Sequence, residues 1–414
     1  MIPQTTGNET NIKLPFSFIL LGLAAFIASQ IILLIYGNNL IIGSFRIPAI
    51  WSAAHLFILG WAVTTAMGAM YQLVPVAFLT PIWSEKLGFF QFFITAIGIL
   101  WFAHALFHAP ETALIPAGLT VLGILLFLLQ MLLTLKKQAK PNVLTLFVGT
   151  GLICFLLTIL LGISLVFSWK TGFLGSYYQP AFKSHLLLGT TGWFTLLIFG
   201  FSYKMVPMFS LSHGFTMKMA KWVFITYFIG LVTTVYSFFT NSQLFLILGL
   251  GLLFFGFTLF SLHIRHILKK RIKKKLDRPF KFALLSIVWG FLIHLLAVLT
   301  ALFGHFDDWV APLMFAYIYL WIALSIMGYL YKIVPFLWWT HKYSKEIGKK
   351  NVPVLKDMIN DRLAVPLFIS DIIGVLLVAI SIGIKQTLLF YIGQAIFCLS
   401  AIVFSTTIAL VMKK

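Results

Sequence analysis

Charged residues are scarce in this chain of 414 residues, at 10% of the total, and only 10 of them are Asp or Glu. Water-soluble domains average about 25% charged residues, so the composition excludes a soluble globule. Hydrophobic residues take their place at 61%, including 43 Phe. A helix needs about 20 apolar residues to cross a hydrocarbon core of about 30 Å, so the length is best counted in membrane spans.

Cysteine is also nearly absent, with Cys154 and Cys398 each inside an apolar run. This excludes a disulfide framework and a CxxC metal motif. The first residues, MIPQTTGNETNIK, lack a charged n-region and a small-residue cleavage site, so no signal peptide is expected. No nucleotide-binding loop, Ser–His–Asp arrangement or paired-carboxylate site is visible, which leaves hydrolase and ATPase functions without support.

The apolar runs predict an all-α polytopic membrane protein with twelve transmembrane helices. Helices are expected because a backbone that faces lipid must satisfy its own hydrogen bonds. The predicted spans are residues 14–37, 51–78, 88–108, 112–135, 143–168, 182–208, 219–239, 243–267, 280–303, 310–339, 364–384 and 387–412.

The net charge of +20 comes from basic residues in short loops between these spans, which argues against a nucleic-acid partner. In a twelve-span chain the basic loops 136–140, 263–281 and 340–363 and the last two lysines fall on one side. The opposite side holds only Arg46, Lys170, Lys183 and Lys385. The positive-inside rule therefore predicts a bacterial plasma-membrane protein with both termini in the cytoplasm. The loop 263–281 is expected to be attracted to anionic lipid headgroups.

A motif recurs three times, at residues 60–75, 192–207 and 320–335, in the frame W-x6-G-x2-Y-x2-V-P. We call these residues the repeat frame: Trp61, Gly68, Tyr71, Val74, Pro75; Trp193, Gly200, Tyr203, Val206, Pro207; Trp321, Gly328, Tyr331, Val334, Pro335. The copies fall in spans two, six and ten. They predict a single transmembrane domain of three parallel four-helix repeats, near 14–140, 141–278 and 279–412.

Each position of the frame suggests a role. The Gly lets a neighbouring backbone approach closely, and the Trp can pack against a large flat group. The Tyr suits the cytoplasmic interface, and the Pro ends or bends the helix. The alternative is that the whole frame serves packing alone.

The chain has ten His. Four are expected in or beside solvated loops, namely His213, His263, His266 and His341. The other six come out in the outer half of the membrane or at its rim: His55, His104, His108, His185, His294 and His305. Neutral imidazole is the commonest metal and heme ligand. A lone His in a span can equally be a hydrogen-bonding contact between helices.

The stretch H-x12-G-x2-Y-x3-P, from His55 to Pro75, resembles the second helix of the catalytic subunit of heme–copper oxidases and nitric-oxide reductases. In that family the helix-two His ligates the low-spin heme, and twelve spans surround a pseudo-threefold axis. A related likeness is to NnrS-type heme- and copper-containing proteins of the nitric-oxide response. The resemblance implies a cytochrome oxidase subunit I-like fold with heme b and, as a further option, copper.

The resemblance also implies a function in respiratory redox chemistry or in the nitric-oxide response. Candidate cofactor ligands are His55, His185 and His294, with His55 as the axial ligand. Because His104 and His108 are four residues apart, they project on one helix face and are the candidate metal ligands. Expected partners are the lipid bilayer, a small gas ligand or quinone, and a second copy or a respiratory subunit.

Departures from the family pattern limit the expected chemistry. The oxidases carry adjacent His residues in helix seven and a His-x-His pair in helix ten, whereas spans seven and ten of this chain have no His. Oxygen reduction to water is therefore not expected, and a substitute copper site would draw on His104, His108 and His185. Asp371, the one clear acid within a span, is expected to be a helix-end residue that reaches water. A transporter, a channel and a cofactor-free assembly subunit stay open as alternatives.

Overall fold

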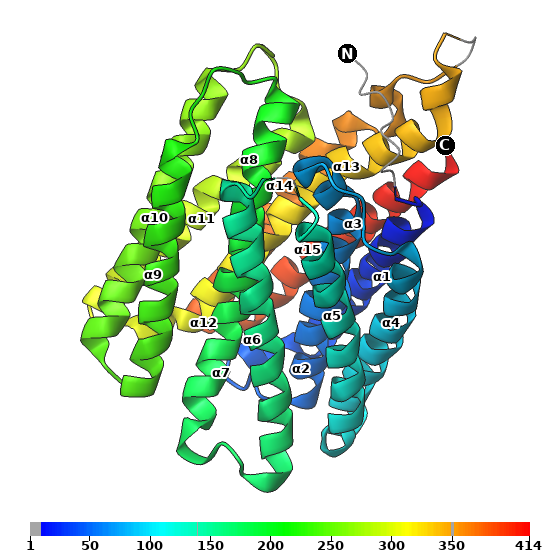
Figure 1. Ribbon diagram of the computed structural model, residues 1–414. Coiled ribbons are helices and arrows are strands. Elements are labelled where there is room, and N and C mark those ends of the chain that lie inside the picture. Colours follow the sequence, from blue (N-terminus) through cyan, green and yellow to red (C-terminus); the bar gives the residue numbers. More distant parts are fainter. Residues whose placement is uncertain (1–9, 139, 349–351) are drawn as a thin grey trace. The chain divides into compact units, whose positions relative to one another are not determined.

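The computed structural model describes residues 10–138, 140–348 and 352–414, and the regular elements of this part are helices (Figure 1). Most of the N-terminal stretch that was tested for a signal peptide, and Lys349 and Lys350 of the loop 340–363, lie outside the described residues. The α-helices are α1 (Lys13–Tyr36), α2 (Pro48–His55), α3 (Thr64–Phe78), α4 (Glu85–His108), α5 (Leu114–Leu135), α6 (Val143–Thr171), α7 (Tyr178–Leu187), α8 (Leu196–Ser210), α9 (Lys218–Thr240), α10 (Gln243–Lys269), α11 (Arg278–Leu302), α12 (Phe306–Ala316), α13 (Leu324–Tyr343), α14 (Asp361–Ile384) and α15 (Thr387–Leu410).

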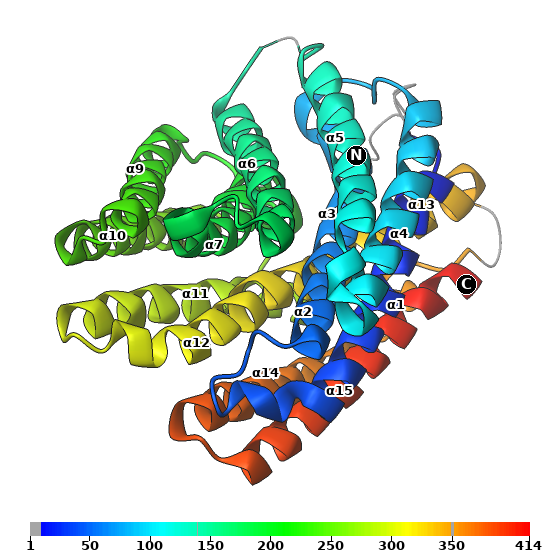
Figure 2. The same ribbon diagram turned by 90° about the horizontal axis from the view of Figure 1, so that it is seen from below.

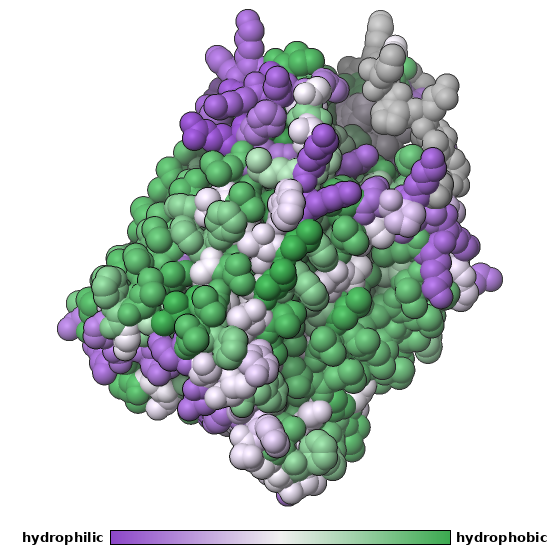
Figure 3. All heavy atoms as spheres, turned by 60° about the vertical axis from the view of Figure 1, so that its left-hand side comes forward, coloured by the Kyte–Doolittle hydropathy of each residue, from purple (hydrophilic) through white to green (hydrophobic). Residues whose placement is uncertain are grey.

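Among the described residues, twelve stretches of helix are long and apolar enough to cross a membrane, as the sequence predicted. The spans run Lys13–Leu40, Pro48–Phe78, Glu85–His108, Leu114–Leu135, Val143–Thr171, Gly175–Ser210, Lys218–Thr240, Gln243–Lys269, Arg278–Leu302, Phe306–Glu346, Asp361–Ile384 and Thr387–Lys413. Hydrophobic side chains cover most of the face shown in Figure 3, as expected for a surface in contact with lipid.

The helices pack as two compact units. The first consists of Met1–Ala139, Asp277–Ala283 and Ile326–Lys414, and the second of Lys140–Leu276 and Leu284–Ser325. Within the first unit α4 pairs with α5 and α14 with α15, and within the second α9 pairs with α10 (Figure 2). Each of these pairs is a helical hairpin of consecutive spans.

Spans two, six and ten share a feature that the sequence did not predict. Each contains a π-helical segment between two α-helices: η2 (Leu56–Val63), η5 (Leu188–Thr195) and η6 (Tyr317–Ala323). The Trp of the repeat frame lies in each segment, two residues before its end. π-Helix is rare and is frequently found at functional sites, so these segments mark where to look for a site.

The Gly of the repeat frame has the role that was predicted for it. A Cβ atom on Gly68 would come 2.7 Å from the carbonyl oxygen of Pro15, and one on Gly200 would come 3.0 Å from the Cβ of Phe147. A Cβ atom on Gly328 would come 2.7 Å from the Cβ of Ala283. In each copy the contacted residue belongs to the first span of the same predicted repeat. The missing side chain of the Gly therefore lets two spans of one repeat touch.

The Trp and Tyr of the frame are buried. Trp61 stacks on Phe26 with ring centroids 4.4 Å apart, and Trp193 stacks on Phe155 at 4.5 Å. Tyr71 is 0% exposed and donates a hydrogen bond to Gln91 Oε1 at 3.0 Å, so its side chain lies inside the helix packing. Its depth relative to the cytoplasmic interface stays a prediction. The aromatic residues of the repeat frame therefore pack inside the protein in all three copies.

Candidate functional site

The core of the second unit holds a group of polar side chains, which we call the hydroxyl chain. It consists of Thr195 in η5, Tyr227 in α9, His294 in α11, and Tyr317 and Trp321 in η6. None is more than 7% exposed. Four spans, the sixth, seventh, ninth and tenth, thus direct polar groups to one place in an apolar interior.

One end of the hydroxyl chain is fixed by His294. Its Nδ1 lies 2.7 Å from the carbonyl oxygen of Gly290, which can only accept, so Nδ1 carries the proton. Nε2 is then the acceptor in the neutral ring, and the Tyr227 hydroxyl, 3.2 Å away, donates to it. The Tyr227 oxygen in turn lies 3.3 Å from the Tyr317 hydroxyl and accepts from it.

The other end is fixed by Trp321, whose indole N–H can only donate. It donates to Thr195 Oγ1 at 2.9 Å, and the Thr195 hydroxyl lies 2.6 Å from the Tyr317 oxygen, to which it donates. The carbonyl of Thr190 offers Thr195 a second acceptor at the longer distance of 3.2 Å. The protons therefore all point one way, from the indole through three hydroxyls to the imidazole.

The π-helical turn of η5 helps to place Thr195. A Thr hydroxyl inside an α-helix bonds the carbonyl four residues back, as Thr158 bonds Cys154 at 2.7 Å. Thr195 instead has its backbone acceptor five residues back, at Thr190, because the turn is wider.

Apolar rings enclose the hydroxyl chain. The Phe257 ring lies 4.4 Å from the His294 ring and 4.9 Å from the Trp321 ring, between centroids. A Cβ atom on Gly290 would come 2.3 Å from Phe257 Cζ, so the glycine makes room for this ring. In such low-dielectric surroundings a satisfied polar network is strengthened, and a broken one is costly.

The predicted ligand His185 is not part of the hydroxyl chain. Its Nδ1 donates to the carbonyl oxygen of Thr158 at 2.9 Å, and its ring packs against Gly162, where a Cβ atom would come 2.9 Å from the ring. His294 and His185 therefore have separate environments within the second unit.

The other predicted ligands lie in the first unit. His55 donates from Nδ1 to the carbonyl of Trp51 at 2.8 Å, and its ring meets the edge of Phe102 on α4 at 5.1 Å. His104 and His108 have ring centroids 4.6 Å apart, as their spacing predicted, and both side chains are exposed.

His263 was expected in a solvated loop, and this is wrong. It lies within α10, is 1% exposed, and its ring bonds Tyr203 and the carbonyl of Thr216, at 3.3 Å and 2.9 Å. It thus ties the segment after α8 to α10.

The side chains that could donate to a metal are not arranged as in the copper centre of an oxidase. In the described part of the chain, no three His, Cys, Asp or Glu side chains come together in a way that could hold a metal ion. Spans six, seven and ten, which carry the copper and heme ligands in the resembling family, direct Thr195, Tyr227 and Tyr317 to a common point instead. Neutral hydroxyl groups that bond one another are poor substitutes for three imidazoles.

Comparison with known proteins gives one kind of match. No family model and no curated protein matches the sequence. Among solved structures, the chain is similar to a heme–copper terminal oxidase dimer determined by cryo-EM, with a TM-score of 0.70 and 12% sequence identity. The match covers 98% of this chain and 85% of that chain. At this identity the likeness shows the fold, and the chain is an all-helical, multi-pass membrane protein with an oxidase subunit I-like fold.

Proposed function

We propose that this chain is a heme-binding membrane protein that acts in respiratory redox chemistry or in the nitric-oxide response, and that His55 holds heme b. The observation that carries the proposal is the tautomer of His55 on an oxidase-like fold. Because Nδ1 donates to the Trp51 carbonyl at 2.8 Å, the lone pair of the neutral ring is on Nε2. A backbone carbonyl on the other nitrogen is the usual way to orient a His ligand.

His185 has the same tautomer, with its lone pair on Nε2, since its Nδ1 donates to the Thr158 carbonyl. It is the candidate for a second heme ligand. His294 differs, because its Nε2 accepts the Tyr227 hydrogen bond, and we assign it to the hydroxyl chain. When bound, the heme supplies one-electron redox chemistry and an iron atom that takes small gas ligands.

Sustained oxygen reduction is not part of the proposed function. The hydroxyl chain occupies the meeting point of spans six, seven and ten with groups that do not bind copper well. Purified protein given a reductant and oxygen should therefore show no continuing oxygen consumption. Steady consumption that disappears in His185→Ala would overturn this part of the proposal.

We propose that the chain lies in the bacterial plasma membrane with both termini in the cytoplasm, and the basic loops support this orientation. The three local copies of the frame, each with its π-helical segment and close Gly contact, support the division into repeats near 14–140, 141–278 and 279–412. The terminal oxidase described above is a dimer, and we propose a second copy or a respiratory subunit as the protein partner.

Absorption spectroscopy tests the heme directly. The full chain, purified in detergent after expression with ample heme, should show a Soret band that is lost or shifted in His55→Ala. The matched control is His266→Ala, which removes an exposed imidazole from α10 and should leave the band unchanged. An unchanged spectrum in His55→Ala would remove His55 as the ligand. The absence of a Soret band in the wild type would refute the heme proposal and favour a transporter, channel or cofactor-free subunit.

A further inference from the structure

Asp371 is a buried acid that the proposed heme function does not use. It lies on α14, ten residues after the helix begins at Asp361, which is about 15 Å along the axis. It is 1% exposed, so the expectation that it reaches water at a helix end is wrong. Among the described residues, neither of its carboxyl oxygens has a hydrogen-bond partner.

The surroundings of Asp371 do not compensate a negative charge. On its own helix it belongs to a stripe of buried apolar residues that includes Ala364, Phe368 and Val375. The hairpin partner α15 approaches closely here, since a Cβ atom on Gly374 would come 2.8 Å from the backbone nitrogen of Phe397. An isolated carboxylate in such a place is very costly, and the group neutralises instead.

Other titratable groups on the neighbouring helices do not change this conclusion. The antiparallel register of α14 and α15 places Cys398, a neutral thiol, near the level of Asp371. On α13, Tyr331 packs against Phe368, and the Lys332 ammonium pairs with Asp277. Lys281 at the start of α11 is exposed.

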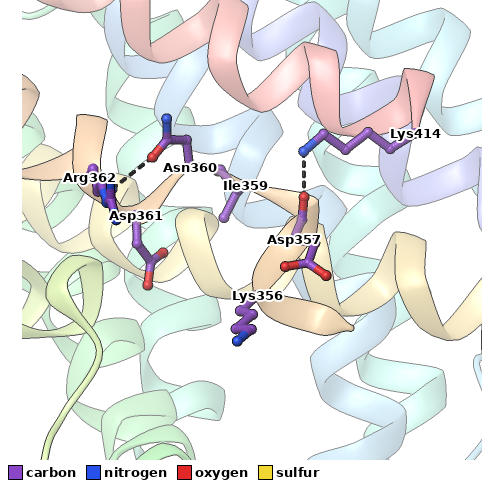
Figure 4. Close-up of a pocket in the computed structure, with 7 residues that line it drawn as sticks. All are labelled: Lys356, Asp357, Ile359, Asn360, Asp361, Arg362 and Lys414. Carbon is purple, nitrogen blue, oxygen red and sulfur yellow. Dashed lines mark hydrogen bonds between the residues drawn. The ribbon is translucent and has the colours of Figure 1, made fainter. Parts of the chain in front are cut away.

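A pocket opens at the beginning of the same helix. It has a volume of about 510 Å³ and is lined by Asp357, Asp361, Lys356 and Arg362 among others (Figure 4). Two carboxylates, of Asp357 and Asp361, and three basic side chains line the pocket, so its lining is suited to water. The pocket lies at the first turn of α14, about 15 Å along the helix axis from Asp371.

We propose that Asp371 is a proton-binding site inside the membrane. It is held as the neutral carboxylic acid and exchanges its proton with water from the pocket at the start of α14. A metal cation is a poor occupant, because hard cations need several oxygen ligands, and the one hydroxyl near this level of α15, on Ser400, bonds the carbonyl of Ile396. The proposal goes beyond the heme function, and none of its readouts requires heme.

A hydrophobic carbodiimide provides the first test, on the full chain in lipid nanodiscs. The O–H of a protonated carboxyl adds across a C=N bond of dicyclohexylcarbodiimide, and the acyl group then moves to nitrogen without loss of any atom. Peptide mass spectrometry should find this adduct on Asp371 at neutral pH and not on Asp361, and the yield should fall as the pH rises. Protection by Na⁺ in place of pH dependence would overturn the proposal in favour of a cation site.

Infrared spectroscopy provides the second test. The wild type should show the C=O band of a protonated carboxyl, which shifts to lower frequency in D₂O and is lost in Asp371→Asn. Asp361→Asn should keep the band and slow its exchange. Absence of the band means that Asp371 is ionised, and a band that does not shift in D₂O means that it is sealed from water. Either result overturns the proposal, and both are read from the wild type even if Asp371→Asn fails to fold.

Discussion

Removal of the Tyr227 hydroxyl should destabilise the protein measurably. Tyr227→Phe keeps the ring but leaves His294 Nε2 without its donor and Tyr317 without its acceptor. A hydrogen bond between membrane helices is worth about 0.6 kcal/mol on average, and a buried group left unsatisfied costs about 1–3 kcal/mol. We therefore expect a loss of about 2 kcal/mol in the free energy of unfolding, which is roughly thirtyfold in the equilibrium constant.

The assay is reversible unfolding in mixed detergent micelles, followed by circular dichroism. The matched control is Tyr236→Phe on the same helix, because this side chain is 51% exposed. It should change the free energy of unfolding by less than about 0.5 kcal/mol.

A double-mutant cycle with His294→Leu isolates the pair. Once the imidazole is gone, Tyr227→Phe no longer leaves a bare Nε2, so its cost should fall by about 1 kcal/mol. A coupling energy near zero, or a loss no greater than that of Tyr236→Phe, would refute the proton assignment of the hydroxyl chain.

Two further predictions concern packing and topology. Gly68→Ala should cost about 1–3 kcal/mol, because its Cβ would come 2.7 Å from the Pro15 carbonyl, whereas Gly118→Ala, which meets nothing within 4 Å, should be neutral or slightly stabilising in the same unfolding assay. Lys274→Cys should react with an impermeant maleimide only after cells are opened, and Lys170→Cys should react in intact cells; the reverse pattern would invert the proposed orientation. The two native cysteines are buried and give a low background.

Much of the fold could be predicted because the signals are local. Apolar runs predicted twelve spans, and the described part of the chain has them with shifts of a few residues at their ends. The repeated Gly was predicted to permit close helix contact, and the distances at Gly68, Gly200 and Gly328 confirm this. Both the apolar length of a span and the small residue at a helix contact are visible within a single stretch of sequence.

The hydroxyl chain could not be predicted in the same way, because it depends on which faces of distant spans meet. Thr195 and Tyr317 are 122 residues apart, and Tyr227 and His294 are 67 apart. One signal was available: Tyr usually lies near the membrane interface, whereas Tyr227 stands well inside span seven. The Trp of the repeat frame lies at the same place in each π-helical segment, but the residue types do not distinguish a π-helix from an α-helix.

The depth of Asp371 has an electrical consequence. A proton that travels about 15 Å from the start of α14 into a hydrocarbon core of about 30 Å crosses roughly half of the membrane voltage. Each elementary charge gains or loses about 2.3 kcal/mol per 100 mV across the whole membrane. The free energy of protonating this carboxyl therefore changes by about 1 kcal/mol for each 100 mV. In an energised cell the fraction of protonated Asp371 would therefore follow the membrane voltage as well as the acidity of the adjoining water.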